Sequence, residues 1–117
     1  MSQHVVEIQA ADWEEKVLRA AGPVVVDFYS SECPPCEALA PRLEAVAAEY
    51  AGRAAVYKIF RQGNRELAVS LGVLGSPTLV FFLGGEEAGA RMTGGAIRPA
   101  DLRRQLDALL SEAGQPA

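Results

Sequence analysis

The segment Val24–Tyr29 constrains the fold more than any other part of the chain. It is a nearly continuous run of β-branched and aromatic residues, interrupted only by Asp27. Such a run is typical of a central strand that is covered on both faces. A long segment with helical periodicity follows, and its predicted buried face carries Leu39, Leu43, Val46, Ala47 and Tyr50. The sequence therefore predicts a sheet that is packed against helices.

Other strands are predicted on both sides of this pair. Strand patterns cover residues 5–8, 54–60 and 78–83, and a weaker pattern over residues 87–93 indicates an edge strand. Gly84-Gly85 stands between the last two strands and predicts a two-residue hairpin turn. These two strands should therefore pair with each other in antiparallel fashion.

Three further helices are predicted. Asp12 suits the N-cap of the first, Asn64 can cap the second, and the last begins near Pro99. The apolar side of the first helix is expected to carry Trp13, Val17 and Leu18. The order is then βαβαβαββα, and a strand–helix–strand order favours parallel pairing. We expect an α/β fold with a central mixed sheet and helices on both faces.

Length and charge limit the kind of protein. The chain has 117 residues, which suits one domain over residues 1–117, with a frayed tail over 111–117. Eleven basic and 15 acidic residues give a formal charge of −4, which argues against nucleic-acid or anionic-membrane partners. No apolar run approaches the roughly 20 residues of a membrane span, and the first residues do not resemble a signal peptide. We expect a cytoplasmic protein.

The two cysteines, Cys33 and Cys36, limit the possible chemistry of the protein more than any other residues. Together with His4, the single histidine, they supply too few ligands for a structural zinc site within one chain, so we expect no metal. The pair lies between a buried strand and the start of a helix, whose free N–H groups and positive dipole end favour a thiolate. We expect the first sulfur to be exposed at the helix tip and the second to be shielded one turn inward. This arrangement is typical of a redox dithiol.

The chain resembles the thioredoxin family over roughly residues 5–110. The resemblance is carried by Val24–Tyr29, by the Cys-Pro-Pro-Cys motif Cys33–Cys36 followed by Leu39–Pro41, and by Gly72–Thr78. The glycine turn and the leucine-rich last helix also stand where the family has a hairpin turn and its final helix. The resemblance implies the thioredoxin fold and a dithiol that exchanges with the disulfides of other proteins.

The resemblance also implies four catalytic residues. Cys33 matches the attacking thiol, and Cys36 matches the thiol that resolves the mixed disulfide. Asp27 matches the family's buried carboxylate beneath the second cysteine, where desolvation should raise its pKa and let it accept the proton of Cys36. Lys58 matches the lysine that faces this aspartate.

A second set of residues is implied to bind the substrate. Pro77 matches the family's cis-proline beside the dithiol, and Gly75 and Ser76 precede it. The backbone of Ser76 would pair with an extended substrate segment. Glu32 stands where the family has a tryptophan before the first cysteine, so an aromatic docking surface is replaced by a carboxylate.

Glu32 and the pair Pro34-Pro35, which stands where the family usually has Gly-Pro, suggest a redox bias through three effects. A carboxylate at Glu32 should oppose a thiolate at Cys33, and Pro34 lacks the N–H that a glycine there would offer the sulfur. Adjacent prolines at 34 and 35 also restrict the reduced loop. All three effects disfavour the reduced thiolate, so we expect a strongly reducing couple and a Cys33 thiol that is less acidic than is usual in the family.

We therefore expect a monomeric protein-disulfide reductase that participates in electron transport and cell redox homeostasis. The resemblance implies a thioredoxin reductase-like electron donor, disulfide-containing protein substrates and no cofactor besides the Cys33–Cys36 disulfide. One alternative is a redox-inactive binding module that uses the surface at Glu32 to hold a single partner. Another is a metal or iron–sulfur site shared across a dimer, with two thiolates from each chain.

Overall fold

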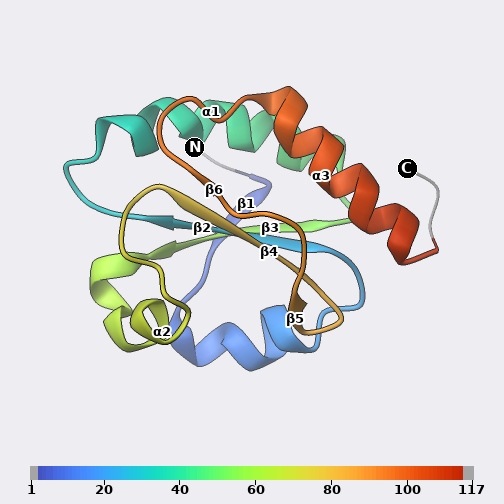
Figure 1. The fold of residues 1–117 in the computed structure, drawn as a ribbon, viewed down its shortest axis with the longest axis horizontal. Helices are drawn as coiled ribbons and strands as arrows, with labels where there is room; N and C mark the ends of the chain where they lie inside the picture. Colours follow the sequence, from blue (N-terminus) through green and yellow to red (C-terminus); the bar gives the residue numbers. More distant parts are fainter. Residues whose placement is uncertain (1–2, 115–117) are drawn as a thin grey trace.

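The computed structural model describes residues 3–114, and a six-stranded sheet forms its centre (Figure 1). The strands are β1 (Val5–Glu7), β2 (Val24–Tyr29), β3 (Ala55–Phe60), β4 (Thr78–Leu83), β5 (Glu86–Glu87) and β6 (Met92–Thr93). Their order is β1-β3-β2-β4-β5, and β6 also pairs with β4. β3 is parallel to β1 and β2, whereas β4 is antiparallel to β2. The predicted mixed sheet is confirmed.

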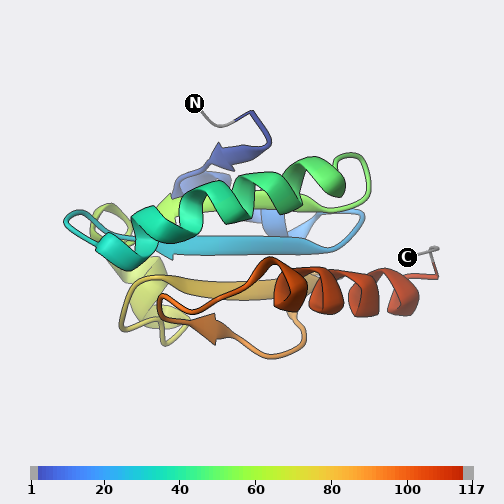
Figure 2. The ribbon, with the colours of Figure 1, turned by 90° about the horizontal axis from the view of Figure 1, so that it is seen from above.

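Helices cover both faces of the sheet (Figures 1 and 2). One face carries α1 (Pro34–Glu49) and α3 (Pro99–Glu112). The other face carries α2 (Arg65–Ser70) and the short helices η1 (Ala10–Asp12) and η2 (Glu14–Leu18). A further short helix, η3 (Arg61–Gly63), joins β3 to α2. None of the helices in the described part of the chain is long and apolar enough to cross a membrane.

The residues of β2 divide between two hydrophobic cores because successive side chains of a strand point to opposite faces. Val25 belongs to the core beneath α1 and α3, whereas Val26 and Phe28 belong to the core that contains Trp13 and Ala68. Both faces of β2 are thus buried, which explains its unbroken apolar pattern. The same alternation places Asp27 on the face that α1 covers.

The first predicted helix differs from expectation. Asp12 is not its N-cap: the helical segment begins after Gln9, and the Asp12 carboxylate accepts the Gln9 N–H at 2.9 Å. The next turn is a π-helix, with Arg19 N–H donating to the Glu14 carbonyl at 2.9 Å. This wider turn keeps Trp13 and Val17 in the core but leaves Leu18 42% exposed, so the prediction for Leu18 is wrong.

Three other local predictions need correction. The edge strand expected over residues 87–93 is split into β5 and β6, with Gly89 at a φ of 72° between them. Asn64 precedes α2, but its side chain bonds to Ala10 N and the Phe60 carbonyl instead of capping the helix. α3 continues to Glu112, so residues 111 and 112 of the expected frayed tail are helical, and residues 115–117 lie outside the described part.

Candidate active site

The topology gathers the predicted site at one edge of the sheet. β2 and β3 are parallel and end together, with Tyr29 opposite Phe60, whereas β4 is antiparallel and begins there, with Thr78 opposite Phe28. The loop to the cysteines, the turn after β3 and the Gly75–Pro77 loop therefore all leave or enter the sheet at the same edge.

The two cysteines stand at the N-terminus of α1. Cys33 is the N-cap residue, and Pro34 and Pro35 occupy the first two helical positions. Prolines are well suited to these positions because the N–H groups there have no partner within the helix. The first N–H that the helix offers is that of Cys36, and it donates to Sγ of Cys33 over 3.2 Å. The helix end thus binds the sulfur that the sequence predicts to be the nucleophile.

Cys33 and Cys36 form a disulfide, with their Cα atoms 5.2 Å apart. The expectation of an exposed first cysteine is wrong for this oxidised state, since both residues are 7% exposed. The Sγ of Cys33 is bonded to Cys36 and accepts a hydrogen bond from the Cys36 N–H. The expected proximity of the two sulfurs is confirmed.

Asp27 is a buried carboxyl group on the face of β2 beneath α1. Its residue is 5% exposed, and its Oδ1 has no hydrogen-bond partner among residues 3–114. Desolvation raises the pKa of Asp27 from 3.8 to about 7, although the positive charge of Lys58 acts in the opposite direction. The predicted elevation of this pKa and its predicted cause are both confirmed.

Lys58 lies directly beside Asp27, because the two residues are paired in the parallel register of β2 and β3. Its Nζ is 5.6 Å from the ring centre of Tyr29, a cation–π contact. The Tyr29 hydroxyl donates in turn to the carboxylate of Glu7. Desolvation by burial is the larger cause and this hydrogen bond the next, and they raise the pKa of Tyr29 to about 12. The lysine thus faces the aspartate, as the resemblance implies.

The Gly75–Pro77 loop enters β4 at the same edge. The Ser76–Pro77 peptide bond is cis, as predicted, and the Thr78 hydroxyl donates to the Gly75 carbonyl at 2.8 Å. Gly75 is exposed and Ser76 is half-buried, whereas Pro77 is buried. A hollow of about 430 Å³ follows this loop and is bordered on its far side by Arg91, Thr93 and Gly94. The loop thus presents backbone to the surface next to an open hollow.

Glu32 is exposed, and its φ of 51° lies in the left-handed region that non-glycine residues seldom adopt. The preceding residue, Ser31, is bound to the turn after β3: its N–H and its hydroxyl both donate to the Gln62 side chain, at 2.9 and 3.1 Å. The loop before Cys33 is therefore tied to the turn after β3. Sequence reasoning missed this tie, which joins residues 31 positions apart in the chain.

Sequence reasoning also missed the role of Arg61, whose Nε donates to the Ser76 hydroxyl at 2.9 Å. The order of the strands could have predicted this contact. Parallel β2 and β3 followed by an antiparallel β4 bring the end of β3 and the start of β4 to one edge, so a polar residue just after β3 lies near the Ser76 loop.

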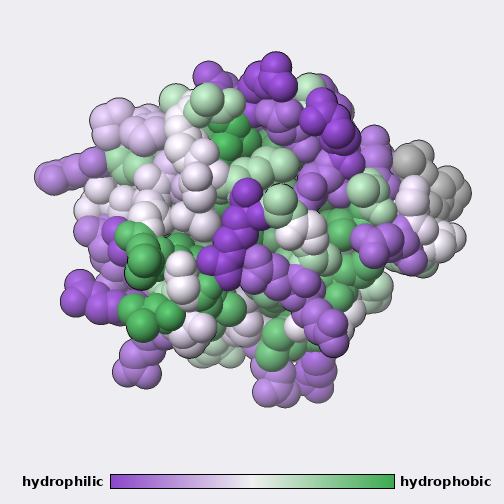
Figure 3. Space-filling view, viewed as in Figure 1, coloured by the Kyte–Doolittle hydropathy of each residue, from purple (hydrophilic) through white to green (hydrophobic). Residues whose placement is uncertain are grey.

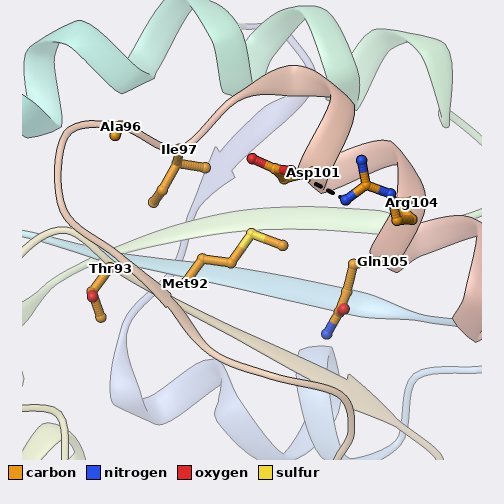
Figure 4. Close-up of a pocket in the computed structure, with 7 residues that line it drawn as sticks. All are labelled: Met92, Thr93, Ala96, Ile97, Asp101, Arg104 and Gln105. Atoms are coloured by element: carbon orange, nitrogen blue, oxygen red, sulfur yellow. Dashed lines mark hydrogen bonds and ion pairs between the residues drawn. The ribbon is translucent and has the colours of Figure 1, made fainter.

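Another hollow, of about 330 Å³, lies between β6 and α3 and contains none of the predicted site residues (Figure 4). Its carboxylate, Asp101, is paired with Arg98 and Arg104, and Gln105 donates to the Ala90 carbonyl. Its charged groups are thus already satisfied. Within the described residues, no three His, Cys, Asp or Glu side chains are grouped to hold a metal ion.

Comparisons with known proteins agree with this geometry. The sequence model of the Thioredoxin family matches residues 4–108. The chain is 38% identical over 108 residues to "Thioredoxin" of Pseudomonas aeruginosa, covering 92% of this chain and 98% of that protein. It is 41% identical over 87 residues to "Thioredoxin" of Peptoclostridium acidaminophilum, covering 74% and 79%. It is also 33% identical over 105 residues to "Thioredoxin X, chloroplastic" of Arabidopsis thaliana, covering 90% and 58%.

The family match over residues 4–108 extends over the whole sheet and both cysteines. Thioredoxins carry out their chemistry with a disulfide of the chain itself and need no separate cofactor. The Cys33–Cys36 pair supplies that disulfide here. The chain belongs to the thioredoxin family and is a thiol–disulfide oxidoreductase that reduces protein disulfides.

Proposed function

We propose that Cys33 and Cys36 divide the reduction of a partner disulfide between them. The Cys33 thiolate attacks one partner sulfur, the partner's S–S bond breaks, and the released partner thiolate takes a proton from solvent. Cys36 then attacks Cys33 Sγ, which forms the Cys33–Cys36 bond and releases the second partner thiol. Two electrons pass from the dithiol to the partner. The disulfide at the N-terminus of α1 is the observation that carries this proposal.

Asp27 is the proposed proton acceptor of the second step. It lies on the face of β2 beneath α1, the helix whose first turn contains Cys36. A pKa of about 7 suits this role, because a general base works best when its pKa is near the ambient pH. In our proposal, Lys58 limits the elevation of this pKa and keeps part of the carboxyl population ionised at neutral pH.

The proposed substrate surface is the Gly75–Pro77 loop together with Glu32. The exposure of Gly75 supports a backbone that is open to pairing with an extended segment. Glu32 is exposed and immediately precedes Cys33, whereas the Gly75–Pro77 loop comes after both cysteines in the chain. A partner that approaches the sulfur would meet its carboxylate.

We further propose that the protein acts as a monomeric, single-domain electron carrier of the cytoplasm that contributes to redox homeostasis. Its electrons would come from a thioredoxin reductase-like electron donor. The two bacterial relatives named Thioredoxin support this setting, whereas the relative named chloroplastic belongs to an organelle.

A coupled assay tests the proposed electron route. The protein, NADPH, a thioredoxin reductase and insulin as a model protein disulfide should together consume NADPH, with a rate proportional to the concentration of the protein. Omitting the reductase should stop turnover, and dithiothreitol should restore it. Failure with the reductase but success with dithiothreitol would reject the proposed donor and leave the exchange chemistry in place.

The couple should be strongly reducing. Only the Cys36 N–H reaches the Cys33 sulfur from the first positions of α1, because Pro34 and Pro35 have no N–H. The carboxylate of Glu32 opposes a thiolate by roughly 0.5–1 kcal/mol if it lies about 8 Å away at an effective dielectric of about 40 to 80. Equilibration with glutathione mixtures should leave the disulfide oxidised under mildly oxidising conditions. Glu32→Gln should shift the equilibrium constant toward the dithiol, by about twofold to fivefold at a pH high enough to ionise the Cys33 thiol.

Glu86→Gln is the matched control, because it removes an exposed carboxylate from β5 and should leave the equilibrium unchanged. A wild-type pair that stays reduced in mildly oxidising mixtures would refute the expected bias.

A further inference from the structure

Arg61 places a positive charge on the loop that is proposed to bind substrate. It is the first residue of η3, immediately after β3, and its side chain is half-buried. Its Nε donates to the hydroxyl of Ser76, the residue before the cis-proline, at 2.9 Å. The guanidinium is therefore held against the substrate loop through one of its nitrogens. Its two terminal nitrogens have no hydrogen-bond partner among residues 3–114.

The charge of Arg61 is also uncompensated. Within the described part of the chain, no carboxylate oxygen lies within 4.0 Å of its side-chain nitrogens. Arg91 borders the hollow of about 430 Å³ beside the Gly75–Pro77 loop, and its charge is paired. It donates to the Glu87 carboxylate at 2.7 and 2.9 Å. In a chain of net charge −4, an unpaired guanidinium at the active-site edge favours a negatively charged partner there.

The surface beside Arg61 has the character of a docking surface. A hollow of about 290 Å³ extends from Arg61 along α2 to Leu74, the residue before Gly75. Leu74 is 83% exposed and Val69 is 63% exposed. Figure 3 shows hydrophobic side chains gathered over α2 and the loop that follows it, with hydrophilic ones around them. Exposed apolar groups next to an unpaired cation suit an amphipathic segment that carries an acidic residue.

We propose that Arg61 is a specificity residue that selects protein disulfides flanked by Asp or Glu. The proposal rests on the proposed binding of an extended substrate segment along the Gly75–Pro77 loop. An acidic side chain within two residues of the attacked cysteine lies about 6–7 Å along such a segment, which is within reach of an arginine at the loop. Its carboxylate would accept hydrogen bonds from the two free terminal nitrogens of Arg61, the bidentate geometry that guanidinium groups favour.

Single-turnover exchange with matched peptides tests this proposal without any reductase. The chemically reduced protein is mixed with peptides that each contain one disulfide and differ only in the residues within two positions of the cysteines, which are Glu, Gln or Lys. Each rate is divided by that of the same peptide with dithiothreitol, which removes differences in intrinsic reactivity. Wild type should reduce the Glu peptide about fivefold faster than the Gln peptide and the Lys peptide slowest. Added salt at 0.5 M should shrink these ratios.

Arg61→Gln should bring the Glu-to-Gln ratio close to one, and Arg61→Glu should favour the Lys peptide. Arg53→Gln is the matched control: Arg53 is exposed and also has no carboxylate partner within 4.0 Å in the described part of the chain, but it precedes β3, whereas Arg61 follows it, so this variant should keep the ratio. A wild-type ratio of one, a ratio that survives Arg61→Gln, or equal loss in Arg53→Gln would overturn the proposal. If wild type reduces none of the peptides, including the Gln peptide, the proposed substrate binding fails as well.

Discussion

Replacing Asp27 with asparagine should make folding stability much less dependent on pH. In the wild type, the unfolded carboxyl ionises near its ordinary pKa of 3.8, whereas burial raises the pKa of the folded one to about 7. Between these values the folded state binds more protons, so wild-type stability falls as pH rises through this window and levels off above it. The unfolding free energy should decrease by about 2–3 kcal/mol more in wild type than in Asp27→Asn between pH 5 and pH 8.

Urea unfolding at several pH values measures this difference directly. The comparison concerns the change with pH, so any constant cost of burying the asparagine amide cancels. Glu86→Gln, on exposed β5, provides a control that should run parallel to wild type. Parallel curves for wild type and Asp27→Asn would show that Asp27 ionises equally in both states, contrary to its burial and its unpaired Oδ1.

Replacing either cysteine with serine should stop turnover in two distinguishable ways. Cys33→Ser removes the attacking sulfur, so reduction of a protein disulfide should fall by roughly a thousandfold or more, because serine is not an effective nucleophile toward sulfur at neutral pH. Cys36→Ser keeps the attacking thiol but removes the resolving one. It should accumulate a mixed disulfide with the substrate, visible by non-reducing mass spectrometry as an adduct that dithiothreitol releases.

The pair of variants is its own control, because each removes one sulfur of the same disulfide and should have a similar effect on stability. An adduct on Cys33→Ser through Cys36, with none on Cys36→Ser, would reverse the assigned roles. Full activity in both variants would exclude the dithiol as the redox group.

Much of the sheet follows from the sequence for one physical reason. β2 and β4 have the predicted bounds because both faces of each strand are buried, so an uninterrupted apolar run marks the whole strand. β5 and β6 lie at the edge, are largely exposed and carry little hydrophobic signal, so the break between them at Gly89 was not predictable from the pattern. Asp12 shows a related ambiguity, since an aspartate can accept an N–H equally well as N-cap or as the third residue of a capping box.

The site was predictable where chemistry depends on residue type and on local position. Cys33 and Cys36 at a helix start imply a short sulfur–sulfur separation, and Asp27 in an apolar strand implies a raised pKa. The burial of Cys33 was not predictable, because it depends on how other parts of the fold cover the residue. The Arg61–Ser76 bond joins residues 15 positions apart and required the strand order as well as the sequence.

A count of thiols tests the central claim most directly. The fully reduced protein is mixed with excess insulin, quenched with acid, alkylated, and weighed as an intact chain. The account predicts that each chain loses both alkylatable thiols, forms the Cys33–Cys36 disulfide and releases two thiols on insulin. Chains that retain both thiols while insulin remains oxidised would contradict it.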